Sequence, residues 1–184
     1  GAMAVLRGAI GALKDIDSVD VCLPLEEIQQ FLLAKWAGRK TVHWRIMEET
    51  VGAVFGSLGF QVAVTQRSAD GGIDVILIYA AQKTIGTQVN HYTDKISAEQ
   101  IRAFVGALVN RGHTEGIYVT TSSFSHGAEY EASVATSRGF PIELVDGEAF
   151  YNAIGIARLE DPVEILATLP NIYETRRLWR IPLR

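Results

Sequence analysis

Cysteine is almost absent from this sequence: Cys22 is the single thiol among 184 residues. One thiol can neither close an internal disulfide nor build a thiolate metal centre. The composition therefore excludes a disulfide-stabilised fold and a cysteine-based metal site, and we interpret Cys22 as a half-buried apolar side chain. This cysteine usage is consistent with a cytoplasmic location, which is the location that we expect.

Long apolar runs are also lacking, although 48% of the residues are hydrophobic. None of the runs reaches the roughly 20 residues that span a bilayer, and the N-terminus shows no signal peptide. The hydrophobic content argues against a disordered chain, and the length suits one domain with an appendage. We therefore expect a soluble, folded protein that does not enter a membrane.

An excess of positive charge is missing as well, since 17 Lys and Arg stand against 21 Asp and Glu, for a net charge of −4. Affinity for nucleic acid comes mainly from basic side chains that neutralise phosphates, but a local basic patch is sufficient. The charge is thus only weak evidence against a nucleic-acid partner. The sequence also has no His-x-x-x-His spacing for zinc and no Gly-rich nucleotide-binding loop.

Hydrophobic periodicity predicts a regular succession of helices and strands. Apolar residues at three- and four-residue spacing indicate helices, and β-branched apolar runs indicate strands. The expected helices are 25–37, 42–58, 97–108, 125–138 and 146–153, with a further one at 161–169, and the expected strands are 60–65, 73–80, 84–90, 116–121 and 140–145.

This succession predicts an α/β fold with a mixed central sheet of about five strands flanked by helices. The early strands follow one another as a hairpin meander, whereas helices that cross over between the later strands imply parallel pairing there. We divide the chain into 1–40, a tag remnant followed by an N-terminal helical arm; 41–155, the main domain; and 156–184, a C-terminal helix with a basic tail. The tail is interpreted as a solvated extension in preference to a DNA contact.

A hairpin between residues 70 and 90 carries the strongest functional signal. Asp74 opens an apolar strand directly after Gly71-Gly72. A carboxylate is costly to bury inside a sheet, so we expect it to face a site at the mouth of the strand. Gln88 and Asn90 lie two residues apart on the returning strand and therefore point to one face. The hairpin can bring one carboxylate and two amides together.

This hairpin resembles the Mrr-like branch of the PD-(D/E)xK nuclease superfamily. That branch carries Gly-Gly-Ile-Asp, a hairpin and Gln-x-Lys. Here Gly71–Asp74 is intact, but the second motif reads Gln88-Val89-Asn90, with asparagine at the lysine position. The resemblance covers about residues 44–150 through several further blocks in the family's order. These blocks are Glu48, Leu58-Gly59-Phe60, Val64-Thr65, Ser68-x-Asp70, His91-Tyr92, Ile101-Arg102-x-Phe104-x-Gly106-Ala107-Leu108, Gly116–Ser125 and Ile142–Gly147.

The resemblance implies a restriction-endonuclease-like fold and metal-dependent cleavage of DNA phosphodiesters. Asp74, Gln88 and Glu48 would then bind Mg²⁺ (or Mn²⁺), which needs only one or two carboxylates among hard oxygen ligands. The metal would polarise the phosphate and lower the pKa of a bound water. Asn90 stands where the catalytic lysine belongs, and loss of one preorganised electrostatic contact costs on the order of a hundred- to a thousandfold in rate. We therefore expect this chain to bind DNA and metal but to cut poorly or not at all.

Other residues are candidates for contact with double-stranded DNA. They come from the loop before the glycine pair and from the ends of the third and fourth expected strands: Ser68, Asp70, His91, Tyr92, Thr121 and Ser122. Each has a plainer alternative as a loop former, surface residue or helix cap. A homodimer is also compatible with the resemblance, because cutting both strands of a duplex needs two active sites.

Two explanations of Asn90 stay open. The chain is either a nuclease domain whose lysine has been changed, by design or by selection against a toxic enzyme, or a natural pseudo-nuclease that serves as a DNA-binding or assembly module. The complete set of other motifs favours the first. A third hypothesis, a partner-binding domain without a nucleic-acid role, is motivated by the acidic charge.

Overall fold

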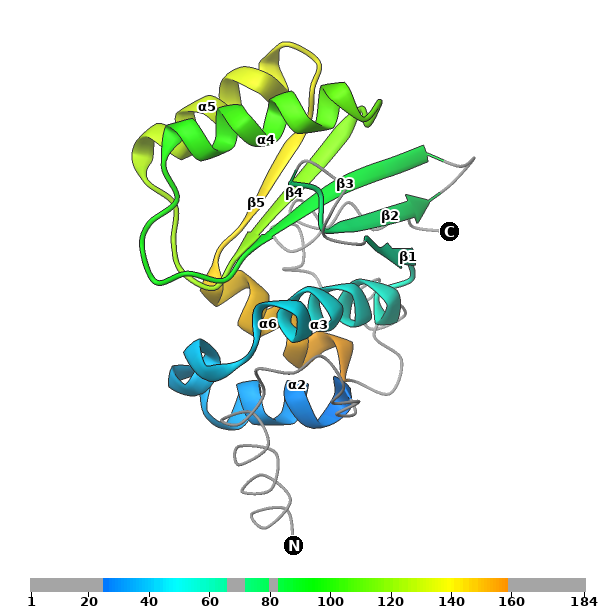
Figure 1. The fold of residues 1–184 in the computed structure, drawn as a ribbon, viewed down its shortest axis with the longest axis vertical. Coiled ribbons are helices and arrows are strands. Elements are labelled where there is room, and N and C mark those ends of the chain that lie inside the picture. Colours follow the sequence, from blue (N-terminus) through cyan, green and yellow to red (C-terminus); the bar gives the residue numbers. More distant parts are fainter. Residues whose placement is uncertain (1–24, 66–71, 80–82, 159–184) are drawn as a thin grey trace, which may run out of the picture.

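The computed structural model describes residues 25–65, 72–79 and 83–158 (Figure 1). Its helices are α2 (Leu25–Ala34), the 3-10 helix η1 (Trp36–Thr41), α3 (Trp44–Ser57), α4 (Ala98–Asn110), α5 (His126–Ser137) and α6 (Gly147–Ala157). Its strands are β1 (Gln61–Val64), β2 (Val75–Tyr79), β3 (Lys83–Asn90), β4 (Glu115–Thr120) and β5 (Ile142–Val145). Several predicted features lie outside the described residues: Cys22, Ser68, Asp70, the helix at 161–169 and the basic tail.

The strands form one mixed sheet in the order β1-β2-β3-β4-β5. The pairs β1–β2 and β2–β3 are antiparallel, whereas β3–β4 and β4–β5 are parallel. Helices α4 and α5 connect the parallel strands and lie over one face of the sheet, and α3 and α6 lie over the other (Figure 1). The predicted α/β fold, a mixed sheet of about five strands flanked by helices, is confirmed.

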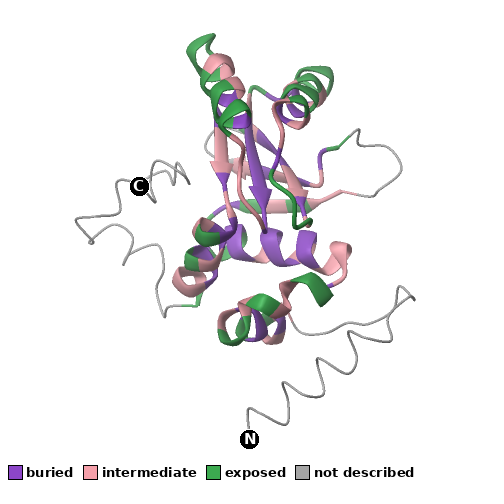
Figure 2. Ribbon diagram, turned by 90° about the vertical axis from the view of Figure 1, so that its left-hand side faces the viewer, coloured by how far each residue is buried: buried purple, intermediate pink, exposed green. Residues whose placement is uncertain are grey.

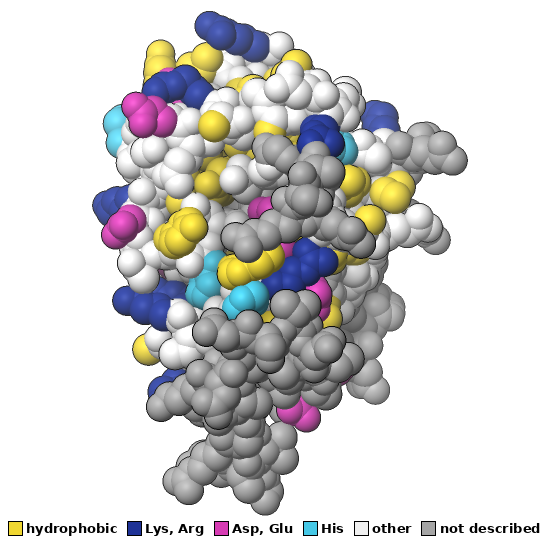
Figure 3. All heavy atoms as spheres, in the orientation of Figure 1, with side chains coloured by type: hydrophobic (Ala, Val, Ile, Leu, Met, Phe, Trp, Pro, Cys, Tyr) yellow, Lys and Arg dark blue, Asp and Glu magenta, His cyan; other side chains and the backbone are white. Residues whose placement is uncertain are grey.

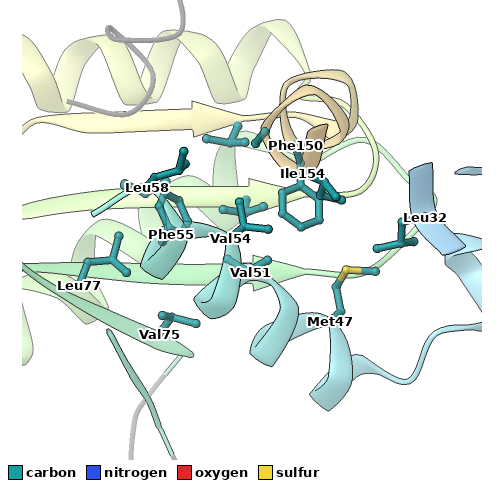
Figure 4. Close-up of a cluster of buried hydrophobic side chains, with 14 of the residues drawn as sticks. Leu32, Met47, Val51, Val54, Phe55, Leu58, Val75, Leu77, Phe150 and Ile154 are labelled. Atoms are coloured by element: carbon teal, nitrogen blue, oxygen red, sulfur yellow. The ribbon is translucent and has the colours of Figure 1, made fainter. Parts of the chain in front are cut away.

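Strand alternation gives each face of the sheet its own hydrophobic core. On the α3 side, the apolar stripe of α3 packs on Val75 and Leu77 of β2 and on α6, and α2 adds Ile28, Phe31 and Leu32 to the same cluster (Figure 4). On the α4 side, a second cluster surrounds Tyr118. Buried residues follow the strands and the inner helix surfaces, while the outer helix surfaces are exposed (Figure 2).

Two paired glycines let α4 approach the sheet closely. Gly86 of β3 and Gly116 of β4 are direct partners in the parallel ladder. A Cβ on either would come within 2.3 Å of a methyl carbon of Leu108, which is fully buried. The Leu108 side chain therefore packs directly against the backbone of these two glycines. The α4 layer is held close to β3, the strand that ends at Asn90.

The predicted elements differ from the observed ones mainly at two helix ends. The helix expected over 25–37 stops at Ala34, and residues 36–41 form η1 rather than a simple break. The last described helix continues to Ala157, beyond the predicted end at 153. Helix α6 includes Gly155, where an added Cβ would lie 3.9 Å from Leu33 of α2. Packing against α2 therefore overrides the weak helix propensity of glycine. No helix in the described ranges is both long and apolar enough to cross a membrane.

Candidate active site

Asp74 lies where β2 and β3 stop pairing with each other. The antiparallel ladder ends with Val75 opposite Thr87, and the Asp74 amide still donates to the Thr87 carbonyl at 2.8 Å. Two residues further along β3, the amide of Val89 donates to Oδ2 of Asp74 at 2.7 Å. The carboxylate thus takes the position of the next ladder partner. It is held in the fork between the two strands by a charge-assisted hydrogen bond.

Gln88 and Asn90 lie on the face of β3 that looks towards α4, as the two-residue spacing predicts. Asp74 and Gln88 are the residues that directly adjoin the last ladder pair, Val75 and Thr87, on the two strands. The side chain of Gln88 lies beside Gly72, where an added Cβ would be 3.6 Å from Nε2 of Gln88. Gly72 has a φ of 98°, a conformation that side-chain-bearing residues rarely adopt. The glycine turn before β2 therefore lies in contact range of the Gln88 amide, and its positive φ is what requires glycine there.

Asn90 is buried, with 6% of its surface exposed. Its Nδ2 donates to the hydroxyl of Tyr118 at 3.4 Å, while its Oδ1 has no hydrogen-bond partner in the described structure. Burial raises the pKa of Tyr118 above its ordinary value, and the negative charge of Asp74 raises it further, against the effect of the Asn90 hydrogen bond. Tyr118 is therefore a neutral hydroxyl close to both Asp74 and Asn90, and the Asn90 amide is only half satisfied.

Glu48 approaches the fork from the opposite layer. Gly52, one turn later on α3, lies against Val64 and Val75, the last pair of the β1–β2 ladder. Glu48 is therefore level with the next pair, Thr65 and Asp74, whose backbones are joined by a 2.9 Å hydrogen bond. Glu48 has only 8% of its surface exposed, and its carboxylate lies towards the strand end rather than in solvent.

Arg45 fixes this corner of α3. Its Nη1 lies 3.2 Å from Oε2 of Glu48 and donates to the Thr65 carbonyl at 2.6 Å, and its Nε lies 3.3 Å from Glu49. The backbone amide of Arg45 donates to Nδ1 of His43, which caps α3. Glu48 is thus oriented by a guanidinium that also donates a hydrogen bond to the backbone just after β1.

His91 joins the end of β3 to the start of α3. Its Nε2 lies 2.7 Å from the carbonyl of Val42, and its Nδ1 lies 3.5 Å from the hydroxyl of Thr121. Burial lowers the pKa of His91, and the nearby charges of Arg39 and His43 lower it further. The neutral ring, with a proton on Nε2, is therefore the form that suits this position.

Among the other predicted substrate contacts, one side chain is exposed and two are already hydrogen-bonded to backbone carbonyls. Tyr92 is 70% exposed just beyond β3. Thr121 is buried and donates to the Tyr92 carbonyl at 3.3 Å, and Ser122 donates to the Thr93 carbonyl at 2.9 Å. Tyr92 thus has a side chain available to a ligand, whereas the Thr121 and Ser122 hydroxyls already tie β4 to the segment after β3.

Three residues near these positions were missed by the sequence reasoning: Arg39, Arg45 and Tyr118. Tyr118 is opposite Gln88 in the β3–β4 register, which the sequence does not specify. Arg39 donates from Nε to the Thr121 carbonyl at 2.9 Å, across 82 residues of sequence. Arg45 precedes Glu48 by three residues on the same helix, and this spacing was the one available signal. Figure 3 shows His side chains beside basic and acidic side chains in the middle of one face.

The donor set suits a hard cation better than zinc. In the described ranges, no three His, Cys, Asp or Glu side chains gather closely enough to form a metal site by themselves. The described candidates are one carboxylate in the fork, the Gln88 amide beside it, the half-satisfied Asn90 amide and Glu48 from α3. Mg²⁺ accepts such neutral and charged oxygens and keeps several waters, so this set is compatible with it.

The fold and this polar fork define a nuclease-type α/β domain, and the family comparison gives its class. The Mrr-type family model described as "Restriction endonuclease" matches residues 39–154. The chain belongs to this family of restriction endonuclease catalytic domains, a family of DNA nucleases. The predicted resemblance is confirmed.

Individual proteins resemble this chain over parts of their length. The chain is 28% identical over 92 residues to the protein y4cE of Sinorhizobium fredii (strain NBRC 101917 / NGR234), covering 47% of this chain and 24% of y4cE. Its fold is similar to the DNA modification-dependent restriction endonuclease AspBHI (TM-score 0.52, 17% identity, 84% of this chain and 41% of that one). It is also similar to the restriction endonuclease FokI (TM-score 0.52, 12% identity, 85% and 33%). The chain thus spans less than half of each of these proteins.

Proposed function

We propose that this chain is the catalytic domain of a metal-dependent endonuclease of a restriction or DNA-defence system, acting on phosphodiester bonds of double-stranded DNA in the cytoplasm. The observation that carries the proposal is the Asp74 carboxylate in the β2–β3 fork, held by the Val89 amide, with Gln88 on the adjoining strand. Membership of the restriction endonuclease family supports it. Cleavage of both strands would require two such domains, which favours a homodimer at work.

In this proposal Asp74, Gln88 and Glu48 hold Mg²⁺ or Mn²⁺. When bound, the metal polarises the phosphate and lowers the pKa of a bound water. The chain's own contribution is to fix the oxygens in advance. The Val89 amide orients Asp74, the Gly72 turn lies beside Gln88, and Arg45 orients Glu48. Such preorganisation is the main protein contribution to phosphoryl transfer.

Asn90 makes the chain an impaired nuclease in this proposal. Its amide donates a hydrogen bond to Tyr118 but carries no charge with which to stabilise the attacking water or the charge that develops on the phosphate. The orphaned Oδ1 supports the explanation that asparagine replaces a lysine here. A buried oxygen without a partner costs about 1–3 kcal/mol, whereas a lysine at this position would present only donors to the Tyr118 hydroxyl and Asp74.

The test is to make Asn90→Lys and to incubate it with supercoiled plasmid and Mg²⁺. We expect cleavage at least on the order of a hundredfold faster than with the Asn90 chain, because one preorganised charge is restored. Asp74→Asn in the Asn90→Lys background keeps an oxygen that can accept from Val89 but removes the charge, and we expect it to abolish cleavage. Asp94→Asn, an exposed acid on the loop after β3, is the matched control.

Plasmid that stays intact with folded Asn90→Lys, across several DNA sequences and base-modification states, would contradict the catalytic proposal. If that variant and the Asn90 chain still bound DNA in a salt-dependent manner, the pseudo-nuclease alternative would take its place. The same orphaned oxygen that supports a replaced lysine argues against this alternative, because a natural binding module has no need to keep an unsatisfied buried amide.

A further inference from the structure

A cavity of about 640 Å³ opens beside the ends of β4 and β5, outside the fork. Its walls come from the end of α2, from η1, from the segment after β4 and from the first turns of α6. The residues that matter for its chemistry are Trp36, Arg39, Ser122, Ser123, Glu148 and Tyr151. Since this pocket combines a guanidinium, hydroxyls and an aromatic ring, it is chemically unlike the two hydrophobic cores.

Arg39 is the fixed element of the pocket. Its Nε donates to the Thr121 carbonyl at 2.9 Å, its Nη1 donates to the Trp36 carbonyl at 3.2 Å, and its guanidinium carbon lies 5.0 Å from the centre of the Trp36 ring. Trp36 is in turn packed edge-on against Tyr151, with ring centres 5.6 Å apart. The guanidinium is therefore held in place before any ligand arrives, which reduces the entropy lost on binding.

The charge of Arg39 has no carboxylate partner among residues 25–65, 72–79 and 83–158. Arg45 and Arg102, by contrast, both form ion pairs with glutamates. Arg39 spends two of its five N–H groups on backbone carbonyls, and the remaining donors are available to an anion. Ser123 also lines the pocket, and its hydroxyl makes no hydrogen bond with the described part of the chain. A half-buried guanidinium without a counter-ion, next to an unengaged hydroxyl, is suited to a phosphate.

The pocket lies next to the candidate active site. The Arg39 charge lowers the pKa of His91, the residue after Asn90, and both Arg39 and His91 contact Thr121. A DNA strand whose scissile phosphate lies at the Asp74–Asn90 fork would continue past this edge of the sheet.

We infer that Arg39, with Ser123, binds a backbone phosphate of the DNA strand next to the one cut at the fork. This inference rests on the proposed function and adds to it a specific anchor outside the metal ligands. Arg39 is a positioning residue: it fixes the register of the DNA without touching the reacting atoms. Phosphate contacts of this kind set position and affinity but do not read sequence.

Glu148 sharpens the inference because it lies at the exposed rim of the same pocket. Its negative charge opposes an incoming phosphate, so removing it is expected to strengthen binding. Changes at Arg39 and Glu148 are therefore predicted to act in opposite directions, a result that general loss of stability cannot produce.

The test measures affinity of the Asn90 chain for a short fluorescent DNA duplex in EDTA, by anisotropy at several NaCl concentrations. We expect Arg39→Ala to weaken binding roughly tenfold and to reduce the salt slope by about 1, as one phosphate contact is lost. Ser123→Asp should weaken binding and Glu148→Gln should strengthen it, each severalfold. Thermal unfolding checks that each variant is folded. If Arg39→Ala does not fold, Ser123→Asp tests the same site.

The control is Arg138→Ala, which removes the same charge from an exposed residue at the end of α5, before β5 and so at the opposite end of that strand from the pocket. If folded Arg39→Ala and Ser123→Asp bind no worse than Arg138→Ala while the parent chain binds DNA well, the phosphate anchor is wrong and the proposed function stands. If the parent chain binds no DNA at low salt, the proposed function fails with it.

A titration with inorganic phosphate distinguishes a DNA backbone phosphate from a small phosphorylated ligand as the group that binds at Arg39. Calorimetric titration of the DNA-free chain with phosphate should show weak binding at most, because a single phosphate lacks the neighbouring contacts of a strand. Tight phosphate binding that depends on Arg39, combined with DNA binding that does not, would assign the pocket to a small phosphorylated ligand and overturn the inference.

Discussion

The two faces of the central sheet are built for different purposes. The face towards α3 and α6 is apolar along the strands, with Val75, Leu77, Ile85, Ile117 and Val119 all buried in one cluster. The face towards α4 begins with the same kind of residues but ends in a polar group at the strand mouth: Asp74, Gln88, Asn90 and Tyr118. Strand alternation lets one set of residues provide stability while its immediate neighbours provide chemistry.

This difference has a cost on each face. On the apolar face the hydroxyl of Thr87 is fully buried without a partner, and on the polar face the same is true of the Asn90 amide oxygen. The Asn90 amide nitrogen still has a partner in the Tyr118 hydroxyl, whereas the Thr87 hydroxyl has none in the described structure. The comparison therefore predicts that equivalent substitutions will have different, and in one case opposite, effects on the two faces.

The largest expected effect is on stability and comes from the apolar face. Leu77→Ala, at a fully buried site, should lower the free energy of unfolding by about 2–5 kcal/mol, since it removes apolar contacts and leaves a cavity. Gln88→Ala, on the other face, should change it by less than about 1 kcal/mol. Urea unfolding measures both, and equal losses would show that the division of labour between the faces is wrong.

A smaller effect should change sign between the faces. Thr87→Val removes a buried hydroxyl that has no partner, and we expect a gain in unfolding free energy of about 1 kcal/mol. Thr120→Val makes the same change on the α4 side, where the Thr120 hydroxyl accepts from the Ser122 amide at 3.1 Å. We expect a loss of about 1 kcal/mol there. Two changes of the same sign in chemical denaturation would count against this account.

The smallest effect concerns the pH dependence of stability. The pKa of His91 is lowered in the folded chain, chiefly by burial, from the ordinary histidine value of 6.5. Around and below pH 6.5, His91 therefore binds more protons in the unfolded chain than in the folded chain. The stability contributed by neutral His91 is full above pH 6.5 and is lost as the pH falls towards the folded pKa. His91→Gln should therefore unfold with a shallower pH dependence between pH 7.5 and 5.

The control for His91 is His126→Gln, because the side chain of His126 is fully exposed. This control should follow the parent curve. His113, whose pKa is also lowered by burial, will keep part of the pH dependence in both variants. A His91→Gln curve that coincides with that of the His126 control would contradict the assigned protonation state.

The fold followed from local sequence signals where those signals were strong. The Ser97–Gln100 capping box forms with both of its hydrogen bonds, and Asp146, the first residue of an expected helix, caps α6. The misplaced ends are those where packing outweighs local preference. Residues 36–41 carry no periodic pattern, yet they form η1 because Trp36 packs against Phe150 and Tyr151 of a distant helix.

The candidate site divides in the same way. Gln88 and Asn90 share a face because of strand alternation alone, and Asp74 joins them through a hairpin of short sequence separation. Tyr118 and Arg39 could not be found from sequence, since one depends on parallel register and the other on a contact 82 residues apart. Which catalytic roles these residues carry stays a prediction until the variants are measured.

The hydrogen bond from Val89 to Asp74 has a practical consequence for anyone who wishes to silence such a domain. Replacing Asp74 by alanine deprives a buried strand amide of its acceptor, so the inert protein would also be a weakened one. The side chain at position 90 takes no part in holding the backbone together. We therefore expect an exchange at position 90 to remove cleavage while the fold and DNA binding are retained.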